Sequence, residues 1–364
     1  MKKKNLLNSI FSPIDFLLGT HKVVGVNPTI PPVRQAEIKS AITVFEYNNE
    51  WVKETELKEV EACFPYKDTN AVTWINVAGL KKEEVEKLCT HFEIHPLLIE
   101  DILSIGQRAK MDDINGLLFC LLNMLYFNDS QNQMESEQLS LILGKNFVIS
   151  FQEDNSRDVF ESLRGKLEMP NSKVRQNKAD FLFYALIDLV VDHYFIVMEK
   201  LGNKIENVEE LIVLYPNTRS LAKINNLRKE MILLKRNVAP VRELVSGILR
   251  SESDLIENRT EKYFKDVYDH IVQATDLSDN YRDMMMNLHD LYINNVNLKM
   301  NEVMKVMAVV TCLLAPATVI GGIFGMNFER IPLLHNKWGF YISVALMLLV
   351  PVMMVRMFRK RGWF

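Results

Sequence analysis

The residues in this chain whose types and spacing could do chemistry form a stripe of aspartate and asparagine between positions 276 and 301. They recur at alternating spacings of four and three, which keeps one face of a helix aimed at one axis in a slightly coiled bundle. The polar members are Asp276, Asn280, Asp283, Asn287, Asp290, Asn294, Asn297 and Asn301. Hard divalent cations such as Mg²⁺ prefer oxygen ligands, and carboxamides can hydrogen-bond their hydration shell. The stripe therefore indicates a path for hydrated divalent cations.

The same spacing continues without a break into small, hydroxyl-bearing and thioether side chains. These members are Met304, Ala308, Thr311, Ala315, Thr318, Gly322 and Gly325. A solvated helix face would be rich in Lys and Glu, yet the stripe contains no Lys. Small residues also mediate ordinary helix contacts in membranes, so the second half alone leaves packing and pore equally open. Together with the Asp/Asn half, this second half favours a pore. One copy of the chain cannot enclose a pore, so a ring of subunits is expected.

Particular positions in the stripe suggest particular roles. A ring of Asp290 carboxylates would concentrate cations at the cytosolic mouth, and Asn301 would line the path above it. Met304 and Met307 would form an apolar constriction that blocks ions when dry. Thr311, Thr318 and Gly322 would line the part within the membrane.

Two uncharged runs near the C-terminus predict membrane-spanning helices. Residues 306–328 number 23 and would span about 34 Å as a helix, while residues 338–355 number 18 and would span about 27 Å. Trp338 and Tyr341 stand at one edge, as interfacial aromatics do. The alternative is a pair of buried core helices.

Lysine and arginine predict the orientation of these spans. The tail carries Arg356, Arg359, Lys360 and Arg361, whereas the connecting loop carries only Arg330 and Lys337. The positive-inside rule therefore places the tail, and with two spans also the N-terminal part, in the cytosol. The basic start of the chain lacks the continuous apolar core of a signal peptide. The expected location is the plasma (inner) membrane, in contact with its lipid.

The predicted fold class is an α+β membrane protein with an N-terminal cytosolic α/β domain, a long helical stalk and two C-terminal transmembrane helices. Strands are expected at residues 42–45, 72–77, 117–127, 139–143 and 147–151, and helices at 81–92, from Pro96, at 182–214, at 220–249 and from about 259 into the first span. The expected division is 1–170 α/β domain, 171–250 antiparallel helical pair, 251–328 stalk and first span, 329–337 extracytoplasmic loop, 338–355 second span and 356–364 basic tail.

Composition and motifs exclude several classes. The net charge of −3 argues against a nucleic-acid partner. The sequence contains no phosphate loop, dinucleotide fingerprint or nucleophile elbow, so an enzyme is not expected. The four cysteines form no CxxC pair and predict no disulfide framework.

The segment Gly321-Gly322-Ile323-Phe324-Gly325-Met326-Asn327, followed by a short loop and a second span, resembles the CorA magnesium transporter family. Further similar stretches are residues 95–103, 137–143, 266–270 and 301–306. The resemblance implies a homopentamer with a funnel-shaped cytosolic part. It also implies that Gly325, Met326 and Asn327 form the selectivity motif, with Asn327 ringing the outer mouth and binding hydrated Mg²⁺.

The resemblance further implies a regulatory Mg²⁺ site between neighbouring subunits at Asp101 and Asp266, with Glu100 and Asp188 as candidates for a second. Mg²⁺ bridging these carboxylates would hold the ring closed, and its loss would leave like charges facing each other. In one respect the sequence departs from the family, because Leu333 stands where its loop usually has Glu. Capture of cations at the outer face should therefore be weaker.

Three other functions are alternatives to a Mg²⁺ channel. A Zn²⁺, Co²⁺ or Ni²⁺ transporter of the same architecture would use softer ligands, for which only Met304, Met307 and Cys312 are candidates in the path. A membrane-anchored sensor or scaffold would have no use for the polar stripe. A membrane-anchored enzyme would need a catalytic constellation.

Uptake of a divalent cation through such a channel needs no ATP. A membrane potential of 100 mV gives a divalent cation about 4.6 kcal/mol, which corresponds to roughly three decades of concentration ratio.

Overall fold

The computed structural model describes residues 40–128, 133–154, 159–327, 331–333 and 336–362. Within these, the chain forms two compact units. The first contains the described residues up to Val197 together with Arg236–Thr275, and the second contains Met198–Lys235 together with the residues from Asp276 onward. All three boundaries between the units fall inside long helices, so the units do not follow the consecutive segments expected from the sequence, and that division stays a prediction.

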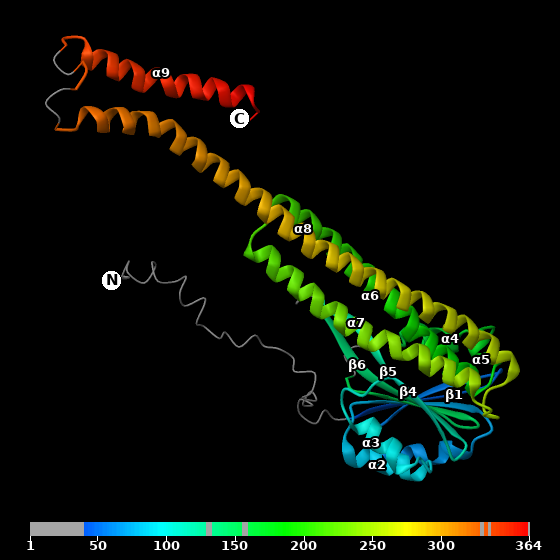
Figure 1. Cartoon of the computed structure of the whole chain (residues 1–364). Coiled ribbons are helices and arrows are strands. Elements are labelled where there is room, and N and C mark those ends of the chain that lie inside the picture. The colour runs from blue at the N-terminus through cyan, green and yellow to red at the C-terminus, as the bar shows by residue number, and fades with distance from the viewer. Residues whose placement is uncertain (1–39, 129–132, 155–158, 328–330, 334–335, 363–364) are drawn as a thin grey trace, which may run out of the picture. The chain divides into compact units, whose positions relative to one another are not determined.

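A seven-stranded sheet forms the centre of the first unit, in the order β2-β1-β3-β7-β6-β5-β4 (Figure 1). Its strands are β1 Ala41–Tyr47, β2 Val52–Leu57, β3 Val72–Ala78, β4 Lys110–Ile114, β5 Leu117–Asn128, β6 Gln133–Leu143 and β7 Phe147–Gln152. Only the pair β3 and β7 is parallel; the other described pairs are antiparallel. The five strands expected from the sequence are confirmed.

The two edge strands, β2 and β4, were not predicted from the sequence. Both are short and carry charged residues, in Val-Lys-Glu-Thr-Glu-Leu and Lys-Met-Asp-Asp-Ile, and neither contains a buried residue. Charged side chains protect an edge strand from pairing with other chains, and they also remove the apolar alternation by which strands are recognised.

Short helices cover one face of this sheet. The 3₁₀ segment η2 Val60–Asp68, α2 Lys82–His91 and α3 Pro96–Leu103 bury Cys63, Leu88 and Ile102 in one cluster with Ile75 and Ile149 of the sheet. The opposite face receives α4 Glu161–Glu168, which follows Phe160, and the first half of α6 (Figure 1). A short α5, Lys173–Gln176, leads into α6. The expected α/β domain is therefore a three-layer arrangement.

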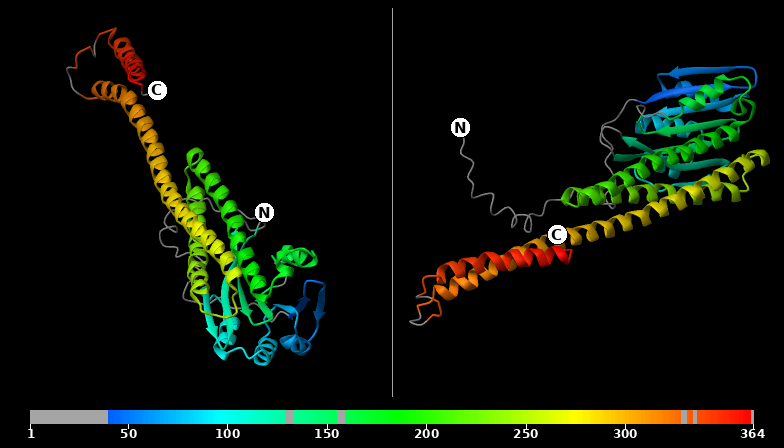
Figure 2. Two further views of the ribbon diagram at one scale, coloured as in Figure 1. Left: turned by 90° about the vertical axis from the view of Figure 1, so that its right-hand side faces the viewer. Right: turned by 90° about the horizontal axis from the view of Figure 1, so that it is seen from above.

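Four long helices complete the described part of the chain: α6 Ala179–Leu214, α7 Thr218–Arg250, α8 Asn258–Phe324 and α9 Gly339–Lys360. The turn between α6 and α7 is fixed by Asn217, whose Oδ1 accepts hydrogen bonds from the backbone N–H groups of Arg219 (2.9 Å) and Ser220 (3.1 Å). In the second unit, α9 runs back alongside the C-terminal part of α8 (Figure 2). The single long helix expected from the sequence is α8, with 67 residues.

In the part of the chain that the structure describes, three helices are long and apolar enough to cross a membrane: α6, α8 and α9. The three helices differ in how much of their apolar surface is buried within the chain. The most apolar window of α6 is 61% buried within the chain, whereas those of α8 and α9 are each only 6% buried. A helix that already packs its apolar residues in protein has no need of lipid, so α6 is a core helix. The two apolar helices expected near the C-terminus are α9 and the end of α8.

Candidate ion path and metal sites

The Asp/Asn stripe lies on one continuous face of α8. Every member from Asp276 to Gly325 is exposed in the single chain, while Ser278, Met285 and Leu288 on other faces of the helix are buried. Tyr281 donates a hydrogen bond to the carbonyl of Met198 on α6 (3.0 Å), which fixes the inner face of α8. The stripe is thus the side of α8 that the chain's own helices leave uncovered.

The carboxylates of the stripe differ in their local charge. Asp283 accepts from Arg282 at 3.1 Å, so a basic group already neutralises it in part. Asp290 forms no ion pair with any described residue. Of the two, Asp290 therefore presents the fuller negative charge, as its expected role requires.

The hydroxyls of the stripe point their hydrogens into the helix. Thr311 Oγ1 donates to the carbonyl of Met307 (2.9 Å), and Thr318 Oγ1 donates to that of Leu314 (3.1 Å). A hydroxyl whose hydrogen is used in this way presents only its lone pairs outward. Around Gly322, a Cβ would meet nothing within 4 Å. Met304 and Met307 are both more than half exposed.

The proposed selectivity motif lies where α8 ends. The backbone N–H of Gly325 still donates to the carbonyl of Gly321 (2.9 Å), and that of Met326 donates to Ile323 (3.3 Å). Asn327 follows the last helical turn, is exposed, and its carboxamide has no hydrogen-bond partner among the described residues. The amide is therefore available to a ligand. Glu329 and Arg330 of the loop lie outside the described residues.

The loop residue Leu333 is held against the start of α9. It adopts a left-handed backbone conformation with φ 72°, and a Cβ at Gly339 would come within 2.1 Å of its carbonyl oxygen. Only glycine fits at position 339. Leu333 itself is 44% exposed, so its side chain is accessible.

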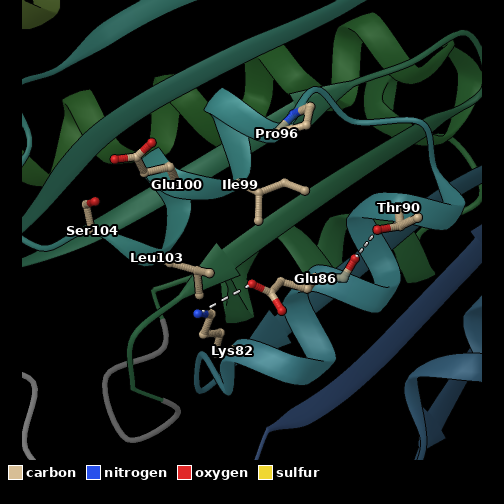
Figure 3. Close-up of a pocket in the computed structure, with 8 residues that line it drawn as sticks. All are labelled: Lys82, Glu86, Thr90, Pro96, Ile99, Glu100, Leu103 and Ser104. Atoms are coloured by element: carbon tan, nitrogen blue, oxygen red, sulfur yellow. Dashed lines mark hydrogen bonds and ion pairs between the residues drawn. The ribbon is translucent and has the colours of Figure 1, made fainter.

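The expected regulatory residues fall in different settings in the first unit. Asp101 on α3 is half-buried and forms an ion pair with Lys110 of β4. Glu100, its neighbour, is exposed and forms no ion pair with a described residue. It lines an open groove of about 580 Å³ between α2 and α3, where Lys82 pairs with Glu86 at 3.7 Å (Figure 3). Asp266 on α8 is exposed.

Asp188 belongs to a cluster that the sequence did not reveal. Within the described part of the chain, one group of potential metal ligands has three members: Asp188 and Asp192 of α6 and His270 of α8, whose ligand atoms all lie within 4.8 Å of one another. Burial raises the pKa of Asp188, and the neighbouring Asp192 raises it further. The spacing of four between Asp188 and Asp192 was a detectable signal, but nothing in the sequence connects them with His270.

The comparisons with known proteins agree with this geometry. The model of the CorA-like Mg²⁺ transporter protein family matches residues 69–360. The cobalt/magnesium transport protein CorA of Thermotoga maritima is 38% identical over 323 residues, which cover 88% of this chain and 92% of that protein. The putative metal ion transporter YfjQ of Bacillus subtilis is 28% identical over 291 residues, covering 80% of this chain and 89% of that protein.

Solved structures share the fold. The complete structure of the CorA magnesium transporter from Methanocaldococcus jannaschii covers 91% of this chain and 100% of its own, with a TM-score of 0.73 at 21% identity. The full-length CmaX protein covers 90% of this chain and 100% of its own, with a TM-score of 0.66 at 17% identity.

The chain combines an α/β unit, a long helix bearing a polar stripe and two terminal apolar helices, and its sequence matches a family of metal-ion transporters. The chain belongs to the CorA-like Mg²⁺ transporter family, as its match over residues 69–360 shows. The resemblance expected from the Gly325-Met326-Asn327 segment is thus confirmed, and the class is that of the CorA-like Mg²⁺ transporters.

Proposed function

We propose that the chain forms a homopentameric channel for membrane-potential-driven uptake of Mg²⁺, with Co²⁺ and Ni²⁺ as further substrates. The observation that carries the proposal is the uninterrupted exposed face of α8 from Asp276 to Gly325. In its first half this face avoids the chain's own packing and offers carboxylate and carboxamide oxygens. A ring of copies would close it around an axis.

The path has four chemical zones in this proposal. Asn327 binds the hydrated cation at the outer mouth, in the motif that it forms with Gly325 and Met326. Thr311, Thr318 and Gly322 line the membrane part, and Met304 with Met307 forms the apolar gate. Asn301 and Asp290 meet the cation on the cytosolic side. Mg²⁺ releases water reluctantly, so oxygen acceptors that contact its hydration shell suit it better than ligands that must replace the shell.

The proposed orientation places both termini in the cytoplasm and the chain in the plasma membrane. The four basic residues after the second span support it, since the loop carries only two. A negative interior then drives cations inward with about 4.6 kcal/mol per divalent ion at 100 mV.

Regulation in this proposal depends on Mg²⁺ bound between subunits. Asp101 of one subunit and Asp266 of its neighbour hold the ion, with Glu100 and Asp188 contributing to a second site. When internal Mg²⁺ is low, uncompensated carboxylates at the interface repel each other and loosen the ring.

The test is flux into liposomes that contain the purified chain, with Mg²⁺ imposed outside and a negative interior. The proposal predicts Mg²⁺ entry that stops when the potential is removed or when Mg²⁺ is loaded inside. Absence of Mg²⁺ entry under these conditions would refute the channel. Entry of Zn²⁺ without Mg²⁺ would favour the transition-metal transporter instead. Asp266→Lys separates regulation from conduction: it should conduct, but internal Mg²⁺ should no longer close it.

A further inference from the structure

The turn between α6 and α7, residues 213–217, carries three consecutive exposed apolar side chains and is called the hairpin tip below. Val213, Leu214 and Tyr215 are 57%, 57% and 62% exposed, whereas Ile212 just before them is fully buried. Single exposed apolar residues are common on protein surfaces, but a contiguous group indicates an interaction surface. The described part of the chain leaves this surface uncovered.

The hairpin tip has a fixed backbone. Ser220 is buried, and its Oγ donates a hydrogen bond to the carbonyl of Tyr215 at 2.7 Å. Asn217 Oδ1 accepts hydrogen bonds from the first backbone N–H groups of α7. The end of α6 and the start of α7 are therefore joined by side-chain hydrogen bonds, so the exposure of the apolar side chains is a property of the fold.

Two hydrogen bonds fix the height of the hairpin tip along α8 (Figure 1). Tyr281 donates to the carbonyl of Met198 at 3.0 Å. Further along, Asn295 Nδ2 donates to the carbonyl of Ile212 at 3.5 Å. Both pairs are separated by 83 residues in the sequence, so α6 and α8 run parallel in one constant register.

This register brings the hairpin tip close to the membrane. Tyr215 is level with Leu298, and the uncharged run of α8 begins eight residues later, at Val306. Eight residues of helix span about 12 Å. The headgroup layer on each side of a bilayer is about 5–7 Å thick, so it fills about half of that distance. The side chain of Tyr215 and the turn beyond it extend across the rest.

The segment of α8 between the hairpin tip and the membrane is also suited to the headgroup layer. Leu298, Met300 and Val303 lie outside the polar stripe and are each more than half exposed. Lys299 and Lys305 are exposed and form no ion pair with a described residue. Lysines near the end of a membrane span typically lay their apolar stems along the helix and place their ammonium groups among the headgroups. The apolar and basic surface thus continues from the hairpin tip to the span.

The charge near the hairpin tip complements an anionic lipid surface. Residues 211–229 contain four basic side chains and no acidic one. Arg219 and Lys223 lie in the first two turns of α7, are exposed, and form no ion pair with a described residue. Glu209 and Glu210 lie one turn before the tip, further from the membrane. Aromatic and apolar side chains beside basic ones are typical of segments that bind the surface of an anionic membrane.

We propose that the hairpin tip binds the lipid headgroups of the membrane that α8 and α9 enter. Val213, Leu214 and Tyr215 contact the headgroup layer, and Arg219 and Lys223 pair with anionic lipid phosphates. The contact attaches the α6–α7 pair directly to the bilayer, in addition to its connection through α8. The inference depends on insertion of α8 and α9 and is independent of ion conduction.

The test uses the full chain in nanodiscs of phosphatidylcholine and phosphatidylglycerol in equal parts. The exposed Cys312 is replaced by Ser, and Leu214→Cys carries an environment-sensitive fluorophore. A nitroxide on the lipid headgroups serves as the quencher. Ile232→Cys is the matched control, because Ile232 is a 61% exposed apolar residue about 21 Å from the start of α7. The nitroxide should quench the fluorophore at position 214 and leave that at position 232 unquenched.

Two further substitutions test the charges. Arg219→Gln and Lys223→Gln should each lower the ratio of lipid-contacting to free tip about fivefold, because one basic side chain near an anionic surface contributes about that preference. The ratio is measured from the quenched fraction at position 214. Unchanged quenching in both variants would refute the pairing with anionic headgroups.

Equal quenching at positions 214 and 232 would overturn the proposal. Blue-shifted emission at position 214 without quenching by lipid would also overturn it, and would assign the surface to a second copy of the chain. Hydrogen exchange on the unsubstituted chain keeps the test decisive if the labelled variants do not assemble. Backbone amides of the hairpin tip should exchange more slowly in these nanodiscs than in phosphatidylcholine alone, and equal exchange would refute the contact.

Discussion

Lys110 Nζ on β4 lies 2.5 Å from Asp101 Oδ2 on α3 and 3.6 Å from Asp112 Oδ2 on its own strand, so the contact with Asp101 joins β4 to α3. The proposed regulatory carboxylate therefore already has a counter-ion within its own chain. Mg²⁺ bound at Asp101 must compete with Lys110 for the same oxygens.

Substituting Lys110→Met should consequently make closure more sensitive to internal Mg²⁺. A partly exposed ion pair contributes about 0.5–1 kcal/mol, so the half-closing concentration should fall roughly two- to fivefold. The measurement is Mg²⁺ flux into liposomes over a range of internal Mg²⁺. Lys82→Met removes a more exposed pair on α2, away from Asp101, and should leave the curve unchanged. An unaltered curve in Lys110→Met would contradict a regulatory role for Asp101.

Removing the carboxamide at the end of α8 should abolish Mg²⁺ flux. Asn327 is exposed and has no described partner, so Asn327→Ala takes away a ligand without breaking an internal hydrogen bond. Assembly, followed by size-exclusion chromatography, should not change. Asn225→Ala on the exposed side of α7 is the matched control. Normal flux through Asn327→Ala would remove this residue from the selectivity motif.

Restoring an acid in the loop should improve capture of external cations. Leu333→Glu adds one negative charge per subunit at an accessible position, so the half-saturating external Mg²⁺ should fall while the maximal flux stays constant. The gain should shrink as ionic strength rises, because salt screens exposed charges. Leu333→Gln has the same shape without the charge and should show no gain. An equal effect of both substitutions would indicate a change of loop conformation.

Glu137 of β6 should make the first unit less stable as the pH rises. Burial raises its pKa from 4.5 to about 7, despite hydrogen bonds from the Asp154 N–H (2.9 Å) and Tyr126 hydroxyl (3.0 Å). Between about pH 4.5 and 7 the folded chain holds a proton that the unfolded chain has lost. The contribution of this proton to the free energy of unfolding is therefore fully present below this window. It is lost as the pH rises through the window, which lowers the free energy of unfolding by about 3 kcal/mol.

A neutral side chain at this position should remove that pH dependence. Glu137→Gln should raise the thermal unfolding midpoint at pH 8 and change it little at pH 5, measured on the full chain in detergent. Glu54→Gln, on the exposed edge strand β2, should have no effect at either pH. The prediction fails if Glu137→Gln unfolds at the same temperature as the parent protein at pH 8.

Local patterns predicted the regular elements well. The Gly144-Lys145-Asn146 turn predicted the hairpin of β6 and β7, and the structure pairs Leu143 with Val148 across it. The absence of Pro and Gly over a long stretch predicted α8. Both patterns are local, because they involve residues of one hairpin or one helix. The local sequence is enough to predict such elements.

Relations between distant segments were not predictable in the same way. The approach of His270 to Asp188 joins two helices, and the pairing of Lys110 with Asp101 joins a helix to an edge strand that itself went unrecognised. Such contacts depend on how the layers pack. The apolar length of α6 also resembles that of a membrane span, and only its burial in the chain shows that it is a core helix.

Thr311 and Thr318 donate their hydroxyl hydrogens to carbonyls of their own helix, and residues 306–326 carry no charged side chain and no carboxamide. A conduit lined in this way offers permeating species electron pairs and withholds hydrogen-bond donors. Chloride and phosphate would lose their water there and receive nothing in return. Discrimination by sign of charge would then need no fixed charge within the bilayer, where charged side chains are costly to place. The part of the stripe within the membrane would exclude anions as a by-product of ordinary helix hydrogen bonding.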